Sequence, residues 1–405
     1  MRIGVYGGTF NPPHLGHMTS ARAAIGALGL EKLLFIPAAA PPHKVLPEGS
    51  AGPLERLDMA ALMADGLDAE PGQRCAVRAD DVELRRAGKS YTADTLAELR
   101  ALHPEDELWL LMGSDMFLSL QSWREPERIT ALAGIAAFAR EEGDSLAVME
   151  RQAVRLREDF GARVALVPLP KVTQLSSTEL RAALAEGEGG ENLWTQVYGY
   201  ILLRGLYRVG KDLRALCDQD LRSASYSMIQ AKRVPHIQGT EAAAAALAER
   251  WGADVEKARR AAILHDCTKY LRAEEQLALC AHWGEELDEL ERSAVKLLHS
   301  KTGAWIARET FGVDDEIFGA IYWHTTGKAD MTLLEKVVYL ADYTEPTREF
   351  RGVEELRALA EKSLDAALLL GFEMSIREMH ERGLPVHHRT EEARAWMLAR
   401  RSKAT

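Results

Sequence analysis

The chain has 405 residues, of which 47% are hydrophobic and 27% charged, and its formal net charge at pH 7 is −11. This length exceeds one ordinary hydrophobic core, so we expect two domains with the composition of a soluble globular protein. The acidic balance argues against a general nucleic-acid-binding surface, but a local basic pocket or a metal ion could still hold small anionic substrates.

Cysteine usage and the start of the chain bear on the compartment. The cysteines are widely spaced and form no CxxC pair, which is typical of reduced thiols; they are Cys75, Cys217, Cys267 and Cys280. The N-terminus opens into an apolar strand pattern without the basic and apolar regions of a signal peptide. No apolar run approaches membrane-spanning length. We therefore expect a cytoplasmic protein with no membrane partner.

The first half alternates short apolar runs with helical patterns. Strands are expected at 3–6, 33–37, 108–112, 135–139 and 164–167, and helices at 54–66 and 92–102. This alternation indicates an α/β Rossmann-like fold, in which helices cover both faces of a parallel sheet. Ligands of such sheets bind beyond the carboxyl ends of the strands, where Gly7 and Gly8 fall.

Strand signals vanish from about residue 212, and the remaining pattern predicts an all-α helical bundle. Helices are expected at 240–251, 255–270, 273–282, 287–298, 333–342 and 353–382. We place the domain boundary near residues 208–214, because the apolar segment 194–207 still reads as the last helix of the first domain. The predicted domains are residues 1–208 and 212–395.

A glycine- and histidine-rich segment follows the first strand: Gly7-Gly8-Thr9-Phe10-Asn11-Pro12-Pro13-His14-Leu15-Gly16-His17. The glycines let backbone N–H groups approach phosphates, and a helix that begins near Gly16-His17 directs its dipole at the same anion. His14 and His17 lie three residues apart, so both can face one phosphate chain. They would donate hydrogen bonds to oxygens that gain charge as an α–β phosphate bond breaks.

A second anion-binding pattern lies far downstream, at Ser176-Ser177-Thr178-Glu179-Leu180-Arg181. It combines a Ser/Thr helix cap with an arginine one turn into the helix. Hydroxyls, helix N-terminal amides and a guanidinium can together hold β and γ phosphates.

These motifs resemble the nucleotidylyltransferase superfamily with its (H/T)xGH signature, and more closely the nicotinate-mononucleotide adenylyltransferases. The closer resemblance covers residues 1–207 and rests on Pro41-Pro42-His43-Lys44, Ser90-Tyr91-Thr92-Ala93-Asp94-Thr95-Leu96, Gly113-Ser114-Asp115, Trp123 and the Ser176–Arg181 motif. Asn11 and Pro13 stand where the family usually has Asp and Ile.

The resemblance implies attack of the nicotinate mononucleotide phosphate on the α-phosphate of ATP, with Mg²⁺ assistance. It implies catalytic roles for His14, His17, Lys44 and Arg181, and recognition of the pyridine ring and its carboxylate by Tyr91, Thr92 and Trp123. The implied ATP site comprises Gly7, Gly8, Thr9, Phe10, Gly16, Gly113, Asp115, Ser176, Ser177 and Thr178.

Two alternatives stay open for this half. Trp123 could be a core residue rather than a stacking partner for the ring. The acceptor could be phosphopantetheine or the amidated pyridine nucleotide, although the 90–96 and Trp123 matches favour the acid.

Ionisable residues lie inside the apolar helical patterns of the second half. His265-Asp266 follows the apolar run 261–264, and Asp342 ends the apolar run 337–341. Buried ionisable groups are costly unless they are paired or bind metal, and His236 completes a set suited to Fe, Mn or Zn. His299 and His324 could hold a second ion, so that two metals clamp a phosphate and generate a hydroxide nucleophile; alternatively they support other ligands or contact phosphate. The remaining histidines, His43 apart, are assigned to solvated faces: His103, His282, His380, His387 and His388.

This half resembles the HD-superfamily phosphohydrolases, specifically the bacterial YqeK family of symmetrical diadenosine tetraphosphate hydrolases, over residues 225–390. The resemblance rests on the ordered series His236, His265-Asp266, His299, Tyr322–Gly327 and Ala341–Pro346. It implies one or two Fe or Mn ions, a dinucleoside polyphosphate substrate that yields ADP, and phosphate contacts from Lys269 and Arg348. Departures from the family pattern at Cys267-Thr268 and Ser300-Lys301-Thr302 leave the substrate preference open.

The sequence therefore predicts a bifunctional enzyme. The competing hypothesis is an adenylyltransferase whose helical half is a non-catalytic nucleotide sensor. Either form is compatible with a homo-oligomer.

Overall fold

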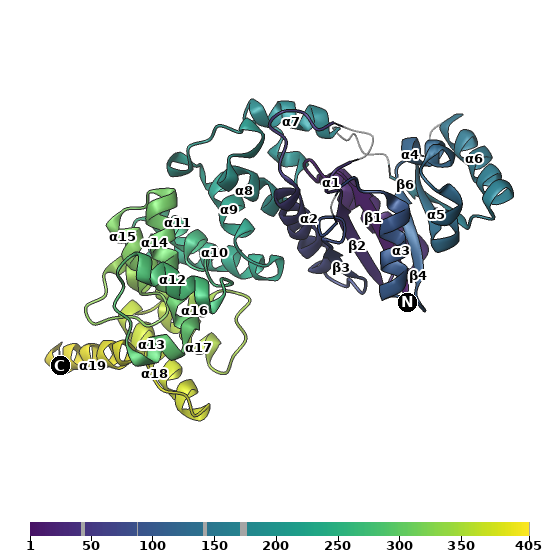
Figure 1. Ribbon diagram of the computed structural model, residues 1–405. Helices are drawn as coiled ribbons and strands as arrows, with labels where there is room; N and C mark the ends of the chain where they lie inside the picture. Colours follow the sequence, from purple (N-terminus) through teal and green to yellow (C-terminus); the bar gives the residue numbers. More distant parts are fainter. Residues whose placement is uncertain (42–44, 87, 141–143, 171–175, 405) are drawn as a thin grey trace. The chain divides into compact units, whose positions relative to one another are not determined.

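The computed structural model describes residues 1–41, 45–86, 88–140, 144–170 and 176–404. The chain divides into two compact units, Met1–Gly210 and Lys211–Thr405 (Figure 1). No helix in these described ranges is both long and apolar enough to cross a membrane.

The first unit is built on a six-stranded sheet in the order β3-β2-β1-β4-β5-β6, and every neighbouring pair is parallel. The strands are β1 (Arg2–Gly8), β2 (Lys32–Pro37), β3 (Ala76–Ala79), β4 (Glu107–Met112), β5 (Gly134–Arg140) and β6 (Val164–Leu169). The expected α/β class is confirmed, but β3 was not expected. This edge strand is four residues long and buries only Val77 fully, so it lacks the apolar run of the inner strands.

Helices cover both faces of the sheet. They are α1 (Leu15–Leu28), α2 (Pro53–Asp68), α3 (Thr92–Leu102), α4 (Ser114–Ser119), α5 (Pro126–Leu132), α6 (Asp144–Phe160), α7 (Ser177–Ala185) and α8 (Thr195–Arg204). Figure 1 shows α2 and α3 on opposite sides of the strands. One hydrophobic core buries alternate strand residues such as Val5 and Leu110 against Leu96 of α3 and Phe117 of α4.

The sheet topology brings the glycines of the predicted phosphate site to one edge of the sheet. β1 and β4 are parallel neighbours, so Gly8 at the end of β1 and Gly113 after β4 lie at the same carboxyl edge. α1 begins beyond the first of these strand ends and α4 beyond the second. This edge is where ligands of open parallel sheets bind.

The second unit contains only helices among its described residues, which confirms the all-α expectation. Its α-helices are α9 (Asp218–Ser227), α10 (Val234–Trp251), α11 (Val255–Leu264), α12 (Ala273–His282), α13 (Glu289–Ser293), α14 (His299–Phe311), α15 (Asp315–Tyr322), α16 (Leu333–Thr344), α17 (Val353–Ala360), α18 (Leu364–Glu381) and α19 (His388–Ala404).

Several predicted helix boundaries were wrong. The helix expected at 255–270 ends at Leu264, and residues 265–270 form turns. The helix expected at 353–382 is broken after Ala360, and Ser363 caps the second piece by accepting a hydrogen bond from Ala366 N. α14 and α15 were not expected, because small and polar residues interrupt the apolar periodicity of both; examples are Ser300, Gly303 and Gly319.

Two candidate active sites

The first candidate site begins with a histidine pair at the start of α1. His14 is the N-cap residue, and its Nδ1 accepts a hydrogen bond from Gly16 N at 3.2 Å. His17 Nδ1 accepts one from His14 N at 3.2 Å, and the two ring centroids are 4.0 Å apart. Because each Nδ1 accepts, each neutral ring carries its proton on Nε2. The pair therefore offers two Nε2–H donors, and α1 begins at Leu15, one residue before the expected start.

These histidines are uncharged at neutral pH. Burial lowers the pKa of His14 to about 4. Burial, together with the neighbouring His14, holds the pKa of His17 well below its usual value. His17 also packs against the rings of Tyr6 and Phe10, whose centroids lie 6.0 and 5.0 Å from its own. The pair can donate hydrogen bonds to an anion without carrying a permanent charge.

Asn11 fixes the loop between β1 and α1. Its Nδ2 donates to Ser50 Oγ at 2.8 Å, and its Oδ1 accepts from Tyr207 OH at 2.8 Å. Its carbonyl accepts from Arg181 Nη1 at 2.7 Å, so the arginine of the downstream motif reaches the histidine loop. The peptide bond between Asn11 and Pro12 is cis. The departure from the family's usual Asp thus places an amide donor at a buried junction.

Arg56 is a buried residue beside this site that the sequence reasoning did not single out. Its side chain is fully buried on α2, where Nη1 donates to Thr9 O at 2.8 Å and Nη2 to Ala39 O at 3.2 Å. Its Nε has no partner among the described residues. The guanidinium joins the loops that follow β1 and β2. The sequence does hold a signal for it, because Arg56 lies on the same face of α2 as the buried Met59 and Met63.

A cavity of about 310 Å³ lies beyond the strand ends of the first unit. Trp123 lines this cavity and is also packed, partly buried, against the hydrophobic core. Arg124 places its guanidinium carbon 4.5 Å from the centroid of the Tyr91 ring. Glu83 accepts from Thr95 Oγ1 at 2.8 Å, and its burial raises its pKa. The predicted residues that line the cavity are Gly7, Gly8, Thr9, Tyr91, Thr92, Gly113 and Trp123.

The other predicted residues of this half are not among those that line the cavity. Phe10 is buried, and Asp115 is exposed in the first turn of α4. Ser176 caps α7, Ser177 begins that helix, and Thr178 Oγ1 accepts from Arg181 Nη2 at 3.1 Å. Gly16 donates to His14, as described above. Lys44 lies outside the described residues, as does the neighbouring His43.

The second candidate site gathers four histidines and two aspartates from separate elements. His236 Nε2 lies 3.0 Å from Asp342 Oδ1 and 3.3 Å from His265 Nε2. His299 Nε2 lies 3.1 Å from His324 Nε2. Because α11 ends at Leu264, the adjacent His265 and Asp266 both face this centre, with His265 Nε2 3.5 Å from Asp266 Oδ2.

Each of these histidines has a hydrogen-bond acceptor at Nδ1, on the side away from the centre. His265 donates to Ala262 O at 2.7 Å, His299 to Lys296 O at 2.5 Å and His324 to Ile321 O at 2.6 Å. His236 donates to Glu345 Oε1 at 2.9 Å. Each ring therefore keeps a lone pair on Nε2, and at His324 the Thr325 hydroxyl lies 3.3 Å from it. Two bare nitrogens 3.1–3.3 Å apart repel each other, and a cation between them removes this repulsion. The donor set fits a divalent metal.

Asp266 lies between the two histidine pairs. Its Oδ2 is 3.5 Å from His265 Nε2 and 3.8 Å from His236 Nε2. Its Oδ1 is 3.2 Å from His299 Nε2 and 3.8 Å from His324 Nε2. One carboxylate oxygen therefore faces each histidine pair.

The pKa shifts of His265, Asp266 and Asp342 favour the forms of these side chains that bind metal ions. Burial lowers the pKa of His265 to about 4. Burial alone would raise the pKa of Asp266, but His265, His299 and Lys269 outweigh it and hold that pKa well below the usual value. The pKa of Asp342 is also well below its usual value, because His236 and Arg348 outweigh its burial. Neutral imidazoles and ionised carboxylates are the ligand forms that bind metal ions.

Three cations surround the carboxylates of the site. Arg233 donates to Asp266 Oδ2 from Nε at 2.9 Å and from Nη2 at 2.6 Å, and Lys269 Nζ lies 3.1 Å from each Asp266 oxygen. Arg348 Nη2 donates to Asp342 Oδ1 at 2.6 Å. The sequence reasoning named Lys269 and Arg348 but missed Arg233, which lies three residues before the first histidine.

Glu345 was missed as well, although it lies in the Ala341–Pro346 segment that carried the family resemblance. Its carboxylate is fully buried and accepts from His236 Nδ1. Thr347 N, at 2.6 Å, and the Thr347 hydroxyl, at 2.5 Å, satisfy its remaining acceptor positions. Glu345 therefore orients His236 toward the centre.

Comparisons with known proteins separate the same two halves. The cytidylyltransferase-like family model matches residues 5–183, and the HD domain model matches residues 233–347. The probable nicotinate-nucleotide adenylyltransferase of Trichlorobacter lovleyi is 36% identical over 221 residues, which cover all of that protein and 51% of this chain. That of Thermus thermophilus is 39% identical over 213 residues, with the same coverage. A solved structure from Clostridium acetobutylicum, described as a predicted HD superfamily hydrolase involved in NAD metabolism, is 38% identical; the match covers 98% of that chain and 46% of this one, with a TM-score of 0.45.

Proposed function

Because the chain belongs, through its first half, to the nicotinate-nucleotide adenylyltransferase family, we propose that this half transfers the adenylyl group of ATP to nicotinate mononucleotide. The products are nicotinate adenine dinucleotide and pyrophosphate. The observation that carries this proposal is the His14–His17 pair, which holds two Nε2–H donors at the start of α1.

The proposed step is a displacement at the α-phosphorus of ATP. A phosphate oxygen of the mononucleotide forms the new bond, and the bond to the β-phosphate oxygen breaks, so that pyrophosphate leaves with the charge. The Nε2–H groups of His14 and His17 donate to the oxygens that gain this charge. Arg181 and the α7 N-terminus hold the departing phosphates. Mg²⁺ bound with ATP would neutralise phosphate charge.

The pyridine ring would occupy the cavity beyond the strand ends. Trp123 and Tyr91 offer aromatic faces there, and Thr92 begins α3, whose N-terminal amides suit a carboxylate. This placement supports the acid form of the mononucleotide as the acceptor over the amide.

The test is the rate of pyrophosphate release from ATP and nicotinate mononucleotide. We expect His17→Ala to lower kcat about 10²- to 10³-fold, the usual cost of removing one such donor. His282→Ala is the matched control, because His282 is an exposed histidine of the other unit. An unchanged kcat in His17→Ala would contradict the assignment.

For the second half we propose metal-dependent hydrolysis of dinucleoside polyphosphates, such as diadenosine tetraphosphate, to ADP. The position of Asp266 between two histidine pairs carries this proposal. One or two divalent ions, iron or manganese, held by His236, His265, Asp266, His299, His324 and Asp342 would neutralise phosphate charge and lower the pKa of the attacking water.

The chain's own cations would position the substrate. As the substrate enters, three side chains would exchange a carboxylate partner for phosphate oxygens: those of Lys269, Arg348 and Arg233. Water attacks one of the two central phosphorus atoms, and the bond from that phosphorus to the oxygen that bridges the two central phosphates breaks. One tetraphosphate and one water thus give two ADP. Glu345 keeps the His236 ring in place during this step.

The experiment is to incubate the protein with diadenosine tetraphosphate, without and with added Fe²⁺ or Mn²⁺, and to separate the products by chromatography. We expect metal-dependent ADP that disappears in Asp266→Ala. Nucleotide that binds without being consumed, and that changes the rate of adenylyl transfer, would instead make the helical half a sensor.

A further inference from the structure

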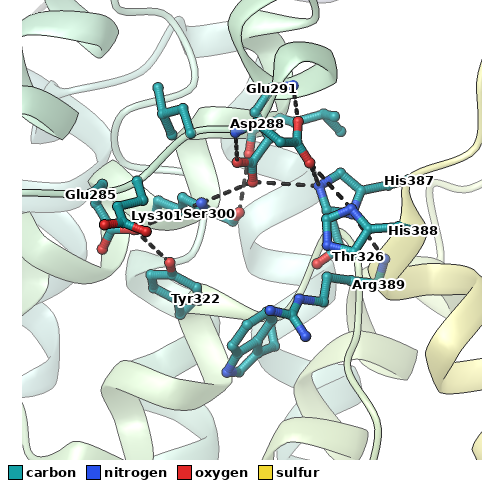
Figure 2. Close-up of a pocket in the computed structure, with 14 residues that line it drawn as sticks. Glu285, Asp288, Glu291, Ser300, Lys301, Tyr322, Thr326, His387, His388 and Arg389 are labelled. Atoms are coloured by element: carbon teal, nitrogen blue, oxygen red, sulfur yellow. Dashed lines mark hydrogen bonds and ion pairs between the residues drawn. The ribbon is translucent and has the colours of Figure 1, made fainter.

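The second unit holds another cavity, of about 530 Å³, that shares no residue with the six candidate ligands. It lies between the segment before α13, the first turn of α14, the end of α15 and the residues around the start of α19 (Figure 2). Ser300, Lys301, Tyr322 and Trp323 form part of its wall. Neither proposed activity uses this cavity.

Potential metal-binding groups meet in its wall. Asp288 Oδ2 lies 3.1 Å from His388 Nδ1 and 3.9 Å from His387 Nε2, and one ligand atom from each of these three residues lies within 4.8 Å of the other two. Glu291 Oε1 lies 3.4 Å from His387 Nε2. Figure 2 shows both imidazoles beside the two carboxylates. His387 is buried, so its assignment to a solvated face was wrong: the neighbouring charged residues in sequence gave no sign of Glu291, which comes from another helix.

The two acids are held in place by hydrogen bonds to each other's backbone amides, and Glu291 Oε2 accepts from Asp288 N at 3.2 Å. Asp288 Oδ1 caps α13 by accepting from Glu291 N at 2.7 Å, so Oδ2 remains directed at the histidines. Lys301 Nζ lies 2.8 Å from Glu291 Oε1. Burial raises the pKa of Glu291, but His387 and Lys301 outweigh it and lower that pKa to about 2. The carboxylate therefore stays ionised.

From this geometry we propose that Asp288, His387 and His388 form a binding site for a divalent transition-metal ion of the zinc type, with Glu291 available as a fourth ligand. Two imidazoles and a carboxylate are the ligands that Zn²⁺ and similar ions select, whereas Ca²⁺ and Mg²⁺ take oxygen ligands. Asp288 is the N-cap residue of α13, and His387 and His388 lie at the start of α19. A bound ion therefore fastens the last helix of the chain to the bundle.

Ion binding changes where the imidazole protons lie. Arg389 N donates to His387 Nδ1 at 3.2 Å, so the ring proton sits on Nε2 and faces Glu291. An ion on Nε2 moves that proton to Nδ1, at the expense of the Arg389 bond. His388 moves its proton from Nδ1 to Nε2, which its half-exposed side chain can present to water. Because ion binding breaks the hydrogen bond from Arg389 N to His387 Nδ1, we expect this site to bind its ion more weakly than the six-residue site.

The test is the zinc content of the full chain, equilibrated with Zn²⁺, passed through a desalting column and measured by mass spectrometry. We expect His388→Gln to lower the content by one equivalent. Asp288→Asn does the same while keeping an N-cap acceptor. The matched control is His380→Gln, an exposed histidine of α18, which leaves the content unchanged. Asp266→Ala lowers the content independently, so the double variant with His388→Gln loses more than either single variant.

A second readout separates metal binding from misfolding. Zn²⁺ should slow amide hydrogen exchange over the first turns of α19 in the wild type and in Asp266→Ala, but not in His388→Gln. Equal zinc content in the wild type, His388→Gln and Asp288→Asn would overturn the proposal. Exchange at the start of α19 that does not respond to Zn²⁺ in the wild type would overturn it too.

Discussion

The two candidate active sites are both built around histidines, but these histidines carry their protons on opposite ring nitrogens. In the first site Nδ1 accepts a backbone N–H and Nε2 is the donor, as at His14 and His17. In the second site Nδ1 donates and Nε2 is bare, as at His265 and His299. The first arrangement suits donation to phosphate oxygens, and the second suits a metal ion.

At His14, His265 and His324 the difference follows from where the residue stands relative to a helix. Free N–H groups are exposed at helix starts and free carbonyls at helix ends. His14 caps the start of α1, so its Nδ1 meets an amide. His265 and His324 follow the ends of α11 and α15, and each donates to the carbonyl three residues before it. Local backbone position thus decides the proton placement at these three residues. His299 begins α14 and His236 lies in the first turn of α10, and there the acceptors Lys296 O and Glu345 Oε1 decide it.

The largest expected effect tests the opposite proton placement in the two sites, by replacing one histidine of each site with glutamine. Glutamine keeps an N–H donor but supplies no imidazole lone pair. His299→Gln should lower metal-dependent hydrolysis about 10³-fold, because a ligand is lost. His17→Gln should lower kcat of adenylyl transfer only about 10-fold, less than His17→Ala, because an N–H remains. Equal losses for His17→Gln and His17→Ala, or full activity in His299→Gln, would contradict the opposite proton placement.

Removing the acceptor behind a ligand histidine gives a smaller effect. Glu345→Ala leaves His236 Nδ1–H without its partner, so the ring loses its orientation. We expect metal affinity, measured by competition with a chelator, to fall about 10- to 100-fold. Glu361→Ala is the control, because Glu361 is an exposed residue of the same unit. Adenylyl transfer should stay at its wild-type rate in Glu345→Ala. An unchanged metal affinity would contradict the role of Glu345 in orienting His236.

The low pKa of His14 in the first site should make the stability of the protein depend on pH. In the unfolded chain a histidine has a pKa of about 6.5, whereas burial lowers the pKa of folded His14 to about 4. Between these two pKa values His14 is protonated in the unfolded chain but not in the folded chain. The free energy of unfolding therefore falls as pH falls. The urea midpoint for loss of adenylyl transfer should therefore be lower at pH 5 than at pH 7. His14→Gln should flatten this dependence, and an equally steep dependence in that variant would reject the cause.

The sequence was informative wherever a short segment carries its own physical signal. Continuous apolar strands predicted the parallel sheet, and the ordered histidines and aspartates of the second half do converge in one centre. The proton placements could not be predicted, because they depend on whether a residue such as His265 lies inside a helix or just beyond it. The expected helix 255–270 would have placed it inside.

Residues that act through distant partners were also beyond sequence reasoning. Arg56 joins two loops from α2, and Glu345 supports a histidine 109 residues away. His387 looked solvated among charged neighbours in sequence, but folding places it against Glu291, 96 residues upstream. In each case the signal is a long-range contact that periodicity does not encode.

The smallest expected effect concerns Asn11, where the chain departs from the usual Asp of its family. Asn11 Nδ2 donates to Ser50 Oγ, and Asn11 Oδ1 accepts from Tyr207 OH. In Asn11→Asp the serine hydroxyl can reverse its role and donate to the carboxylate, so no buried group loses its partner. We expect kcat of adenylyl transfer to change less than about 3-fold and stability by less than about 1 kcal/mol. Asn11→Leu is the informative contrast, because it strands the buried Tyr207 hydroxyl and should cost about 1–3 kcal/mol in urea unfolding. If Asn11→Asp lowered stability as much as Asn11→Leu, the N–H donor of Asn11 would itself be required. The loop between β1 and α1 would then depend on the hydrogen bond donated to Ser50, and not only on a partner for each buried polar group.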